Sequence, residues 1–141
     1  MVDKVLEVIT TSEEETVELG KRIGESLKGK EVICLLGELG AGKTTLVKGI
    51  AQGMGILEGY QVRSPTFTLI NEYPTKKGKI FHADLYRVKD IKLDEFLGEG
   101  VILIEWAEDL SICDVVISIE FVEKGRLIKI WHGKAYLNKK D

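Results

Sequence analysis

Cysteine and histidine are scarce in this sequence, with two of each in 141 residues. Cys34 and Cys113 lie inside apolar, strand-like runs without CxxC spacing, so we expect reduced core cysteines rather than a disulfide or a metal site. His82 and His132 show no metal-ligand spacing, and no HxxxH motif or Cys/His cluster occurs. We therefore expect both histidines to be structural.

Long apolar runs and a strong charge of one sign are also lacking. No run reaches transmembrane length and Met1-Val2-Asp3-Lys4 is not an apolar signal region, so we expect a cytoplasmic protein with no membrane partner. The net charge of −3 argues against a free-standing nucleic-acid binder, because neutralising a phosphate backbone needs a basic surface. The lysine clusters at 76–79 and 138–141 are interpreted as a turn and a solvated tail.

Internal repeats, linkers and low-complexity segments are absent too. Residues 1–141 are therefore expected to form one domain, with a flexible tail at 137–141. Its 44% hydrophobic and 30% charged residues are typical of a soluble globular protein, so a packed core is expected.

The most informative stretch is Gly37-Glu38-Leu39-Gly40-Ala41-Gly42-Lys43-Thr44, which fits GxxxxGK[ST], the phosphate-binding loop (P-loop) of nucleoside-triphosphate enzymes. Glycines allow backbone N–H groups to point inward around the phosphates. Lys43 is placed to contact the β and γ phosphates, and the Thr44 hydroxyl to bind a bridging Mg²⁺. An apolar run at 31–36 and helical spacing from Lys43 to about Gly53 supply the strand, loop and helix that the motif requires.

Local patterns predict the other elements. Ser12 and Glu15 spell a capping box before a helix that ends at Gly29, with a buried stripe of Val17, Leu19, Ile23 and Leu27. A short helix is predicted at 90–98, and strands or hairpin arms are predicted at 4–10, 79–87, 101–106, 115–122 and 127–132. The segment 64–73 is predicted to begin with a proline-fixed turn and to continue as a β-rich segment, followed by a turn at 74–78.

The uninterrupted apolar run at 101–106 suits a strand covered on both faces in the middle of a parallel sheet. Together with the P-loop, it predicts the α/β class. We expect a three-layer P-loop fold whose parallel central sheet is flanked by antiparallel strands or hairpins.

Two acids are candidates for completing the P-loop site. Asp84 follows Ile80-Phe81-His82-Ala83, and Glu105 follows Val101-Ile102-Leu103-Ile104, so each stands at the end of an apolar run. A P-loop enzyme needs such a strand-end carboxylate for the magnesium shell, and hydrolysis needs a group for the attacking water. Either acid can fill either role, or be an ordinary strand-end acid.

Three further features have both a functional and an ordinary interpretation. The segment 64–68 stands where other P-loop enzymes carry a nucleotide-sensing switch, or is a plain proline turn. Arg87 can stabilise charge on a phosphoryl group or pair with a surface acid. Trp106 follows a strand end and is either core or near the site.

Four blocks in this order and spacing, 37–45, 64–69, 82–87 and 105–106, resemble the TsaE (YjeE) family, the bacterial ATPases of threonylcarbamoyladenosine tRNA modification. The resemblance implies Mg²⁺-dependent binding and hydrolysis of ATP. It also implies a complex with TsaD and TsaB, which transfers the threonylcarbamoyl group to adenosine 37 of tRNAs that read ANN codons. The resemblance further implies that ATP hydrolysis resets this complex between turnovers and that contact with tRNA is indirect.

The resemblance also implies roles for residues. Lys43 and Thr44 would bind phosphate and magnesium, Glu105 would be a magnesium-linked acid, and Asp84 would be needed for hydrolysis. Thr66 would fall in the switch-like segment, whereas Tyr86, Arg87 and Trp106 would lie on or near the face that engages the partner. The expected nucleotide contacts are Glu38, Leu39, Gly40, Ala41, Gly42, Lys43, Thr44 and Thr45, with an adenine pocket around Ser12, Glu13 and Glu123.

Other functions remain to be weighed. A small-molecule P-loop kinase is the main alternative, but it needs a lid bearing arginines, and Arg63, Arg87 and Arg126 lie in separate segments without a long insertion. Asn138-Lys139-Lys140-Asp141 matches the guanine-binding NKxD pattern, but it lacks the strand and helix that such a motif needs. A module with an inactive nucleotide site is not predicted, because Lys43, Thr44 and a strand-end acid are all present.

Overall fold

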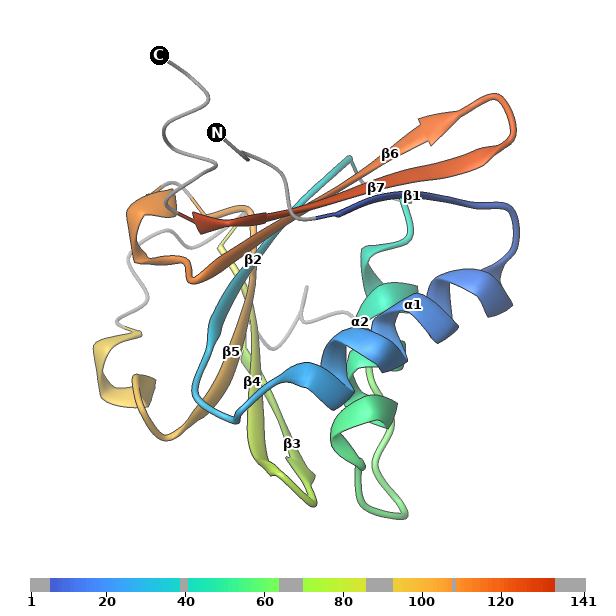
Figure 1. Cartoon of the computed structure of the whole chain (residues 1–141). Coiled ribbons are helices and arrows are strands. Elements are labelled where there is room, and N and C mark those ends of the chain that lie inside the picture. Colours follow the sequence, from blue (N-terminus) through green and yellow to red (C-terminus); the bar gives the residue numbers. More distant parts are fainter. Residues whose placement is uncertain (1–5, 39–40, 64–69, 86–92, 108, 134–141) are drawn as a thin grey trace.

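A mixed seven-stranded sheet forms the centre of the protein (Figure 1). The computed structural model describes residues 6–38, 41–63, 70–85, 93–107 and 109–133, and within them the strands lie in the order β1-β7-β6-β2-β5-β4-β3. Their bounds are β1 Leu6–Thr10, β2 Val32–Leu36, β3 Ile70–Thr75, β4 Gly78–Asp84, β5 Gly100–Glu105, β6 Val115–Val122 and β7 Gly125–His132.

The four central strands, β6, β2, β5 and β4, are parallel, and antiparallel strands flank them on both sides. β5 is buried along its whole length, as expected for a strand covered on both faces. Parallel strands end at the same edge of a sheet, so Asp84 and Glu105 stand side by side there. This arrangement confirms the predicted α/β class with a parallel centre and antiparallel flanks.

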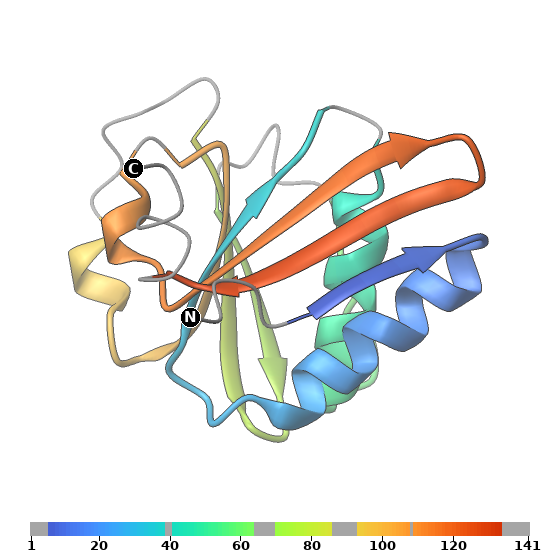
Figure 2. The same ribbon diagram turned by 45° about the horizontal axis from the view of Figure 1, so that its top comes forward.

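Helices cover one face of the sheet, and short 3₁₀ turns lie over the other (Figures 1 and 2). The helices are α1 (Glu13–Ser26) and α2 (Lys43–Met54), and the 3₁₀ turns are η1 (Asp94–Phe96) and η2 (Leu110–Ile112). Alternation along the strands sends Ile80 and Leu103 into the apolar core under the helices, and Phe81 and Ile102 into a second core on the opposite face. Among the described residues, no helix is long and apolar enough to cross a bilayer.

Several predicted boundaries differ from the structure, and α1 is one of them, because it ends at Ser26 rather than at Gly29. Pro74 belongs to β3 and pairs with Lys79, so the turn is shorter than predicted. Proline is compatible with this strand because β3 lies at the edge of the sheet, where a missing N–H breaks no ladder. The described part of the predicted helix at 90–98 forms only the turn η1, and residues 90–92 lie outside the described residues.

The start of α1 confirms Ser12 as the N-cap, since its Oγ accepts a hydrogen bond from Glu15 N at 3.1 Å. The return half of the capping box is displaced by one residue. The Glu15 carboxylate accepts from Thr11 N at 2.7 Å and from the Thr11 hydroxyl at 3.0 Å, rather than from Ser12 N. The hydrogen bond from Thr11 N, with that from its hydroxyl, lowers the pKa of Glu15.

The buried side of α1 is narrower than its apolar pattern predicted, because glycines occupy its centre. Leu19 is buried, whereas Val17 and Ile23 are only half-buried. Gly20 and Gly24 are buried against α2. They face Gly49 and Gly53 there, and a Cβ added to any of the four would overlap backbone atoms of the opposite helix. The two helices therefore pack backbone to backbone.

Replacing Gly49 by alanine tests this close contact. In an exposed helix, Gly→Ala stabilises by up to ~1 kcal/mol, but here the new Cβ overlaps the Val17 carbonyl oxygen, and such overpacking costs about 1–3 kcal/mol. We expect Gly49→Ala to lower the midpoint of thermal unfolding measured by circular dichroism. Gln52→Ala, at an exposed position of the same helix, should leave it nearly unchanged. A Gly49→Ala protein as stable as the parent would contradict the contact.

The two cysteines form a disulfide, which corrects the expectation of reduced thiols. Cys34 lies on β2 and Cys113 precedes β6, and the parallel pairing of these strands brings their Cα atoms to 5.9 Å. Sequence spacing could not reveal the pair, because the fold joins positions 79 residues apart. The expectation that both are core residues is confirmed, since both are buried.

Candidate functional site

The P-loop connects the end of β2 to the start of α2. Gly42 adopts a left-handed backbone conformation with φ 107°, which favours glycine, and α2 begins at the next residue, Lys43. The helix has no side-chain cap among the described residues, so its first N–H groups are free to bind an anion. The loop thus has the strand, turn and helix context predicted from the sequence.

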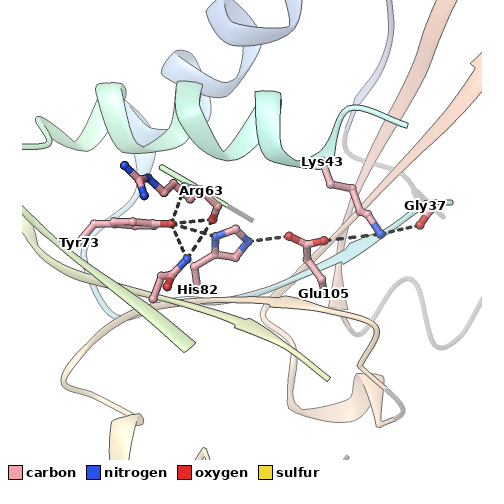
Figure 3. Close-up of polar contacts among 7 residues, drawn as sticks. Gly37, Lys43, Arg63, Tyr73, His82 and Glu105 are labelled. Carbon is pink, nitrogen blue, oxygen red and sulfur yellow. Dashed lines mark hydrogen bonds and ion pairs between the residues drawn. The ribbon is translucent and has the colours of Figure 1, made fainter. Parts of the chain in front are cut away.

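Lys43 is buried at the carboxyl edge of the central strands (Figure 3). Its Nζ donates to Gly37 O at 2.7 Å, lies 3.6 Å from Glu105 Oε1 and stands 4.3 Å from the centre of the Trp106 ring. Burial lowers the pKa of the Lys43 ammonium, and the charges of Glu105 and Asp84, together with a hydrogen bond to Glu105, offset part of this effect. The ammonium is therefore held in a partly dehydrated site between the Gly37 carbonyl and the Glu105 carboxylate.

Glu105 ends β5 and makes a second contact behind the lysine. Its Oε2 lies 2.6 Å from His82 Nε2, and His82 is fully buried. His82 was expected to be merely structural, so its direct contact with a candidate acid was missed. The signal was present in the sequence: His82 precedes Asp84 by two residues, and strand alternation places both side chains on one face of β4.

Asp84 ends the neighbouring strand and is paired with Glu105 across the parallel ladder. Its side chain is buried, and its charge raises the pKa of Lys43. The backbone continues the alignment, because Leu85 N donates to Glu105 O at 3.0 Å. Both candidate acids therefore lie at one edge of the sheet, near the lysine of the P-loop.

Trp106 follows Glu105 and has a left-handed backbone conformation, with φ 63°. Such a conformation is uncommon for a bulky residue and costs of the order of 1 kcal/mol, so surrounding contacts must enforce it. It turns the indole ring beneath the Lys43 ammonium. Trp106 therefore lies against the lysine of the P-loop, and its functional role stays a prediction.

A polar cavity of about 300 Å³ opens beside the P-loop, lined in part by Ser12, Glu13, Gly42 and Thr45. These residues join the start of α1 to the start of α2, where the adenine pocket was expected. The hairpin between β6 and β7 contributes Gly125 and Arg126 to the lining. Glu123 lies exposed in the turn of that hairpin, and its contact with a nucleotide stays a prediction.

Arg126 connects this hairpin to the P-loop, a contact that sequence reasoning missed. Its Nε donates to Ala41 O at 2.9 Å, its Nη1 donates to Gly125 O at 3.3 Å, and its guanidinium stacks over the Phe121 ring at 4.2 Å. No local motif marks Arg126, because the pairing of β6 with β2 brings the hairpin to the loop, and this pairing cannot be deduced from a short window of sequence. The residue supports the loop from the side opposite Glu105.

Several predicted site residues cannot be placed. Leu39 and Gly40 of the P-loop, Thr66 of the switch-like segment, and Tyr86 and Arg87 all lie outside the described residues. The described members of the predicted P-loop contacts are Glu38, Ala41, Gly42, Lys43, Thr44 and Thr45. All six lie between the end of β2 and the first turn of α2.

Comparisons with known proteins agree with this arrangement. The model of the family described as "Threonylcarbamoyl adenosine biosynthesis protein TsaE" matches residues 10–129. The chain belongs to the TsaE family. It is 52% identical over 120 residues to the tRNA threonylcarbamoyladenosine biosynthesis protein TsaE of Aquifex aeolicus, covering 85% of this chain and 90% of that protein. It is 44% identical over 109 residues to TsaE of Bacillus subtilis, covering 74% and 68%.

A solved structure extends the comparison to three dimensions. The crystal structure of YdiB from Bacillus subtilis superimposes with a TM-score of 0.76 at 36% identity, and the match covers 94% of this chain and 89% of that one. The expected TsaE membership and fold class are therefore confirmed, and the chain is a member of a family involved in threonylcarbamoyladenosine modification of tRNA.

The support that Arg126 gives to the P-loop can be measured without any ligand. A hydrogen bond to a charged donor contributes about 1.5–3 kcal/mol, so its loss should speed backbone hydrogen exchange in the loop by roughly tenfold or more. We expect Arg126→Ala to accelerate exchange in peptides spanning 37–43, by mass spectrometry. Lys124→Ala, which removes an exposed charge from the same hairpin, serves as the control. Equal rates of hydrogen exchange at 37–43 in the Arg126→Ala and Lys124→Ala proteins would contradict the claim that Arg126 stabilises the P-loop.

Proposed function

We propose that this protein is a Mg²⁺-dependent ATPase that works with TsaD and TsaB in the threonylcarbamoylation of adenosine 37 of tRNAs reading ANN codons. The observation that carries the proposal is the buried Lys43 ammonium at the start of α2, between the Gly37 carbonyl and the Glu105 carboxylate. A cation in this position has the chemistry to bind the β and γ phosphates. The assignment to threonylcarbamoyladenosine biosynthesis is supported by the names of the relatives.

ATP binding is assigned to the loop and to the polar cavity beside it. The backbone amides around Gly42, Lys43 and Thr44 receive the phosphates, since the helix start has no side-chain cap in the described structure. The cavity next to Ser12 and Glu13 receives the nucleoside. When ATP binds, the Lys43 ammonium exchanges the Glu105 carboxylate for phosphate oxygens. The triphosphate carries more negative charge than the single carboxylate that it replaces.

The residues present fit a magnesium ion. Mg²⁺ in nucleotide sites takes one or two protein ligands besides phosphate oxygens and water, and carboxylates and hydroxyls are suitable. Thr44 and Glu105 would hold it, because Thr44 lies in the first turn of α2 and Glu105 ends β5, which pairs with the strand before the P-loop. When bound, Mg²⁺ neutralises charge on the phosphates.

Asp84 is assigned to the attacking water. The carboxylate lies next to Glu105 at the same strand edge, so the two acids can divide their tasks. In hydrolysis, the water oxygen bonds to the γ phosphorus while the bond to the β-phosphate oxygen breaks, and ADP leaves with the bonding electrons. Asp84 orients the water and accepts its proton, which passes on to phosphate or solvent.

Turnover by the isolated protein is expected to be slow. Exclusion of water from the site contributes to the rate of hydrolysis, and we assign this exclusion to the partner proteins. Partner proteins would complete the site, with Thr66, Tyr86, Arg87 and Trp106 assigned to the switch and the partner face. Contact with tRNA is then indirect, through the complex, which agrees with the net charge of −3.

Substitutions at the three charged residues test the division of roles. Lys43→Ala should weaken binding of a non-hydrolysable ATP analogue by about 10- to 100-fold, because charge-assisted contacts disappear. Asp84→Asn should lower hydrolysis about 100-fold or more while sparing binding, and Glu105→Gln should weaken only Mg²⁺-dependent binding. Binding is measured by calorimetry and hydrolysis by phosphate release. The exposed Asp94→Asn serves as the control.

The partner requirement is tested in the same assays. Adding TsaD and TsaB should raise the rate of ATP hydrolysis, whereas an unchanged rate with the reconstituted complex would contradict the proposal.

Equal loss of nucleotide binding and hydrolysis in the Asp84→Asn protein would reject the division of roles between Asp84 and Glu105. Transfer of the γ phosphate to a small acceptor rather than to water would favour the kinase alternative.

A further inference from the structure

Behind Glu105, buried polar side chains from three adjacent strands form a chain of contacts (Figure 3). Glu105 Oε2 on β5 lies 2.6 Å from His82 Nε2 on β4. On the other side of the ring, His82 Nδ1 lies 3.4 Å from the Tyr73 hydroxyl on β3. The contacts therefore run from the lysine of the P-loop to the edge strand of the sheet.

The far end of this chain is fixed by backbone. Arg63 N donates to the Tyr73 hydroxyl at 3.0 Å, and the hydroxyl lies 2.9 Å from Arg63 O. Asn71 Nδ2 donates to Arg63 O at 3.1 Å and to the Tyr73 hydroxyl at 3.3 Å. Tyr73 is thus held by both polar groups of one peptide residue and by a neighbouring amide.

Polar side chains are less favourable than apolar ones at buried positions whose only role is to fill the core. Tyr73, His82 and Glu105 are 4%, 0% and 5% exposed, and their neighbours Ile80 and Leu103 in the same core are apolar. A buried polar group costs about 1–3 kcal/mol unless it is hydrogen-bonded, so an apolar side chain would suit position 82 better if packing were its only role. The position of His82 is explained by its bond to Glu105.

The donors and acceptors in the chain are consistent. An ionised carboxylate only accepts hydrogen bonds, so the proton between His82 and Glu105 belongs to His82 Nε2. The Tyr73 hydroxyl has one proton, which it donates to Arg63 O. Its oxygen accepts from Arg63 N and Asn71 Nδ2 and lies 3.4 Å from His82 Nδ1. The hydroxyl is therefore fixed on the side of the ring away from Glu105.

We propose that His82, backed by Tyr73, is a positioning residue for Glu105 in the nucleotide site. The inference rests on the proposed function. His82 holds Oε2 of the carboxylate, so that Oε1 is the oxygen that faces the P-loop, 3.6 Å from Lys43 Nζ. One carboxylate oxygen is thus fixed by the sheet, and the other is presented to the phosphate and metal end of the loop.

Removing the imidazole should release the carboxylate. Without the bond from His82, Glu105 can rotate and offer both oxygens to the Lys43 ammonium, its nearest cation among the described residues. Lys43 would then be held more strongly by protein, and the carboxylate would be less available to a metal. Both effects oppose binding of a magnesium–nucleotide complex, because each occupies a group that the complex needs. Substitutions behind a metal ligand typically cost 10- to 100-fold in metal affinity.

The test measures Mg²⁺ dependence of binding rather than activity. A fluorescent, non-hydrolysable ATP analogue is titrated against the full chain at increasing Mg²⁺ concentration. We expect His82→Leu to raise the half-saturating Mg²⁺ concentration about 10-fold or more, and His82→Gln, which keeps an N–H donor, to recover a large part of this loss. Tyr73→Phe should shift it in the same direction by a smaller factor. His132→Leu, at an exposed position on β7, is the matched control.

A double-substitution cycle separates positioning from a general packing effect. If His82 acts through Glu105, His82→Leu has no further effect on Mg²⁺ dependence in a Glu105→Gln background. An unchanged half-saturating Mg²⁺ concentration in His82→Leu, or equal shifts in the two backgrounds, would overturn the inference. If circular dichroism shows that the His82→Leu protein does not fold, the test uses His82→Gln and Tyr73→Phe instead. Wild-type Mg²⁺ dependence of binding in the Tyr73→Phe protein would then overturn the inference. Absence of Mg²⁺-dependent binding in the parent protein would instead reject the proposed function.

Discussion

The parallel pairing of β2 with β5 is the constraint on which the candidate site depends. Register places Leu35 opposite Glu105, so the P-loop that follows β2 begins beside the acid that ends β5. Lys43 then has a carboxylate within 3.6 Å at the point where the protein buries its ammonium. A buried charge without such a partner is strongly unfavourable, so the sheet register makes this lysine position possible. A shift of one residue would turn the Glu105 side chain to the opposite face.

The loop is supported on both sides by segments distant in sequence. On one side, β4 and β3 supply His82 and Tyr73 behind Glu105. On the other, the hairpin of β6 and β7 supplies Arg126 to the carbonyl of Ala41. The backbone contact between α1 and α2 fixes the helix that follows the loop. Contacts of this kind hold the proposed phosphate-binding groups in a fixed arrangement.

Local sequence patterns predicted the helices and strands, the P-loop and the two strand-end acids, because each of these features depends on residues that are close together in the sequence. Interactions across the fold were harder to predict. The disulfide between Cys34 and Cys113 and the contact of Arg126 with the loop depend on which strands are neighbours, and no spacing rule reveals that. His82 is an intermediate case: its face was deducible from strand alternation, but its partner on β5 required the register.

The most direct measurement is a crystal structure of the protein with Mg²⁺ and a non-hydrolysable ATP analogue. The account predicts the triphosphate against the backbone amides around Gly42 and Thr44, with Lys43 Nζ on phosphate oxygens. It also predicts Glu105 directed at the metal and still bonded to His82. A loop without nucleotide at saturating concentration, or a Glu105 carboxylate turned away from the metal, would contradict it.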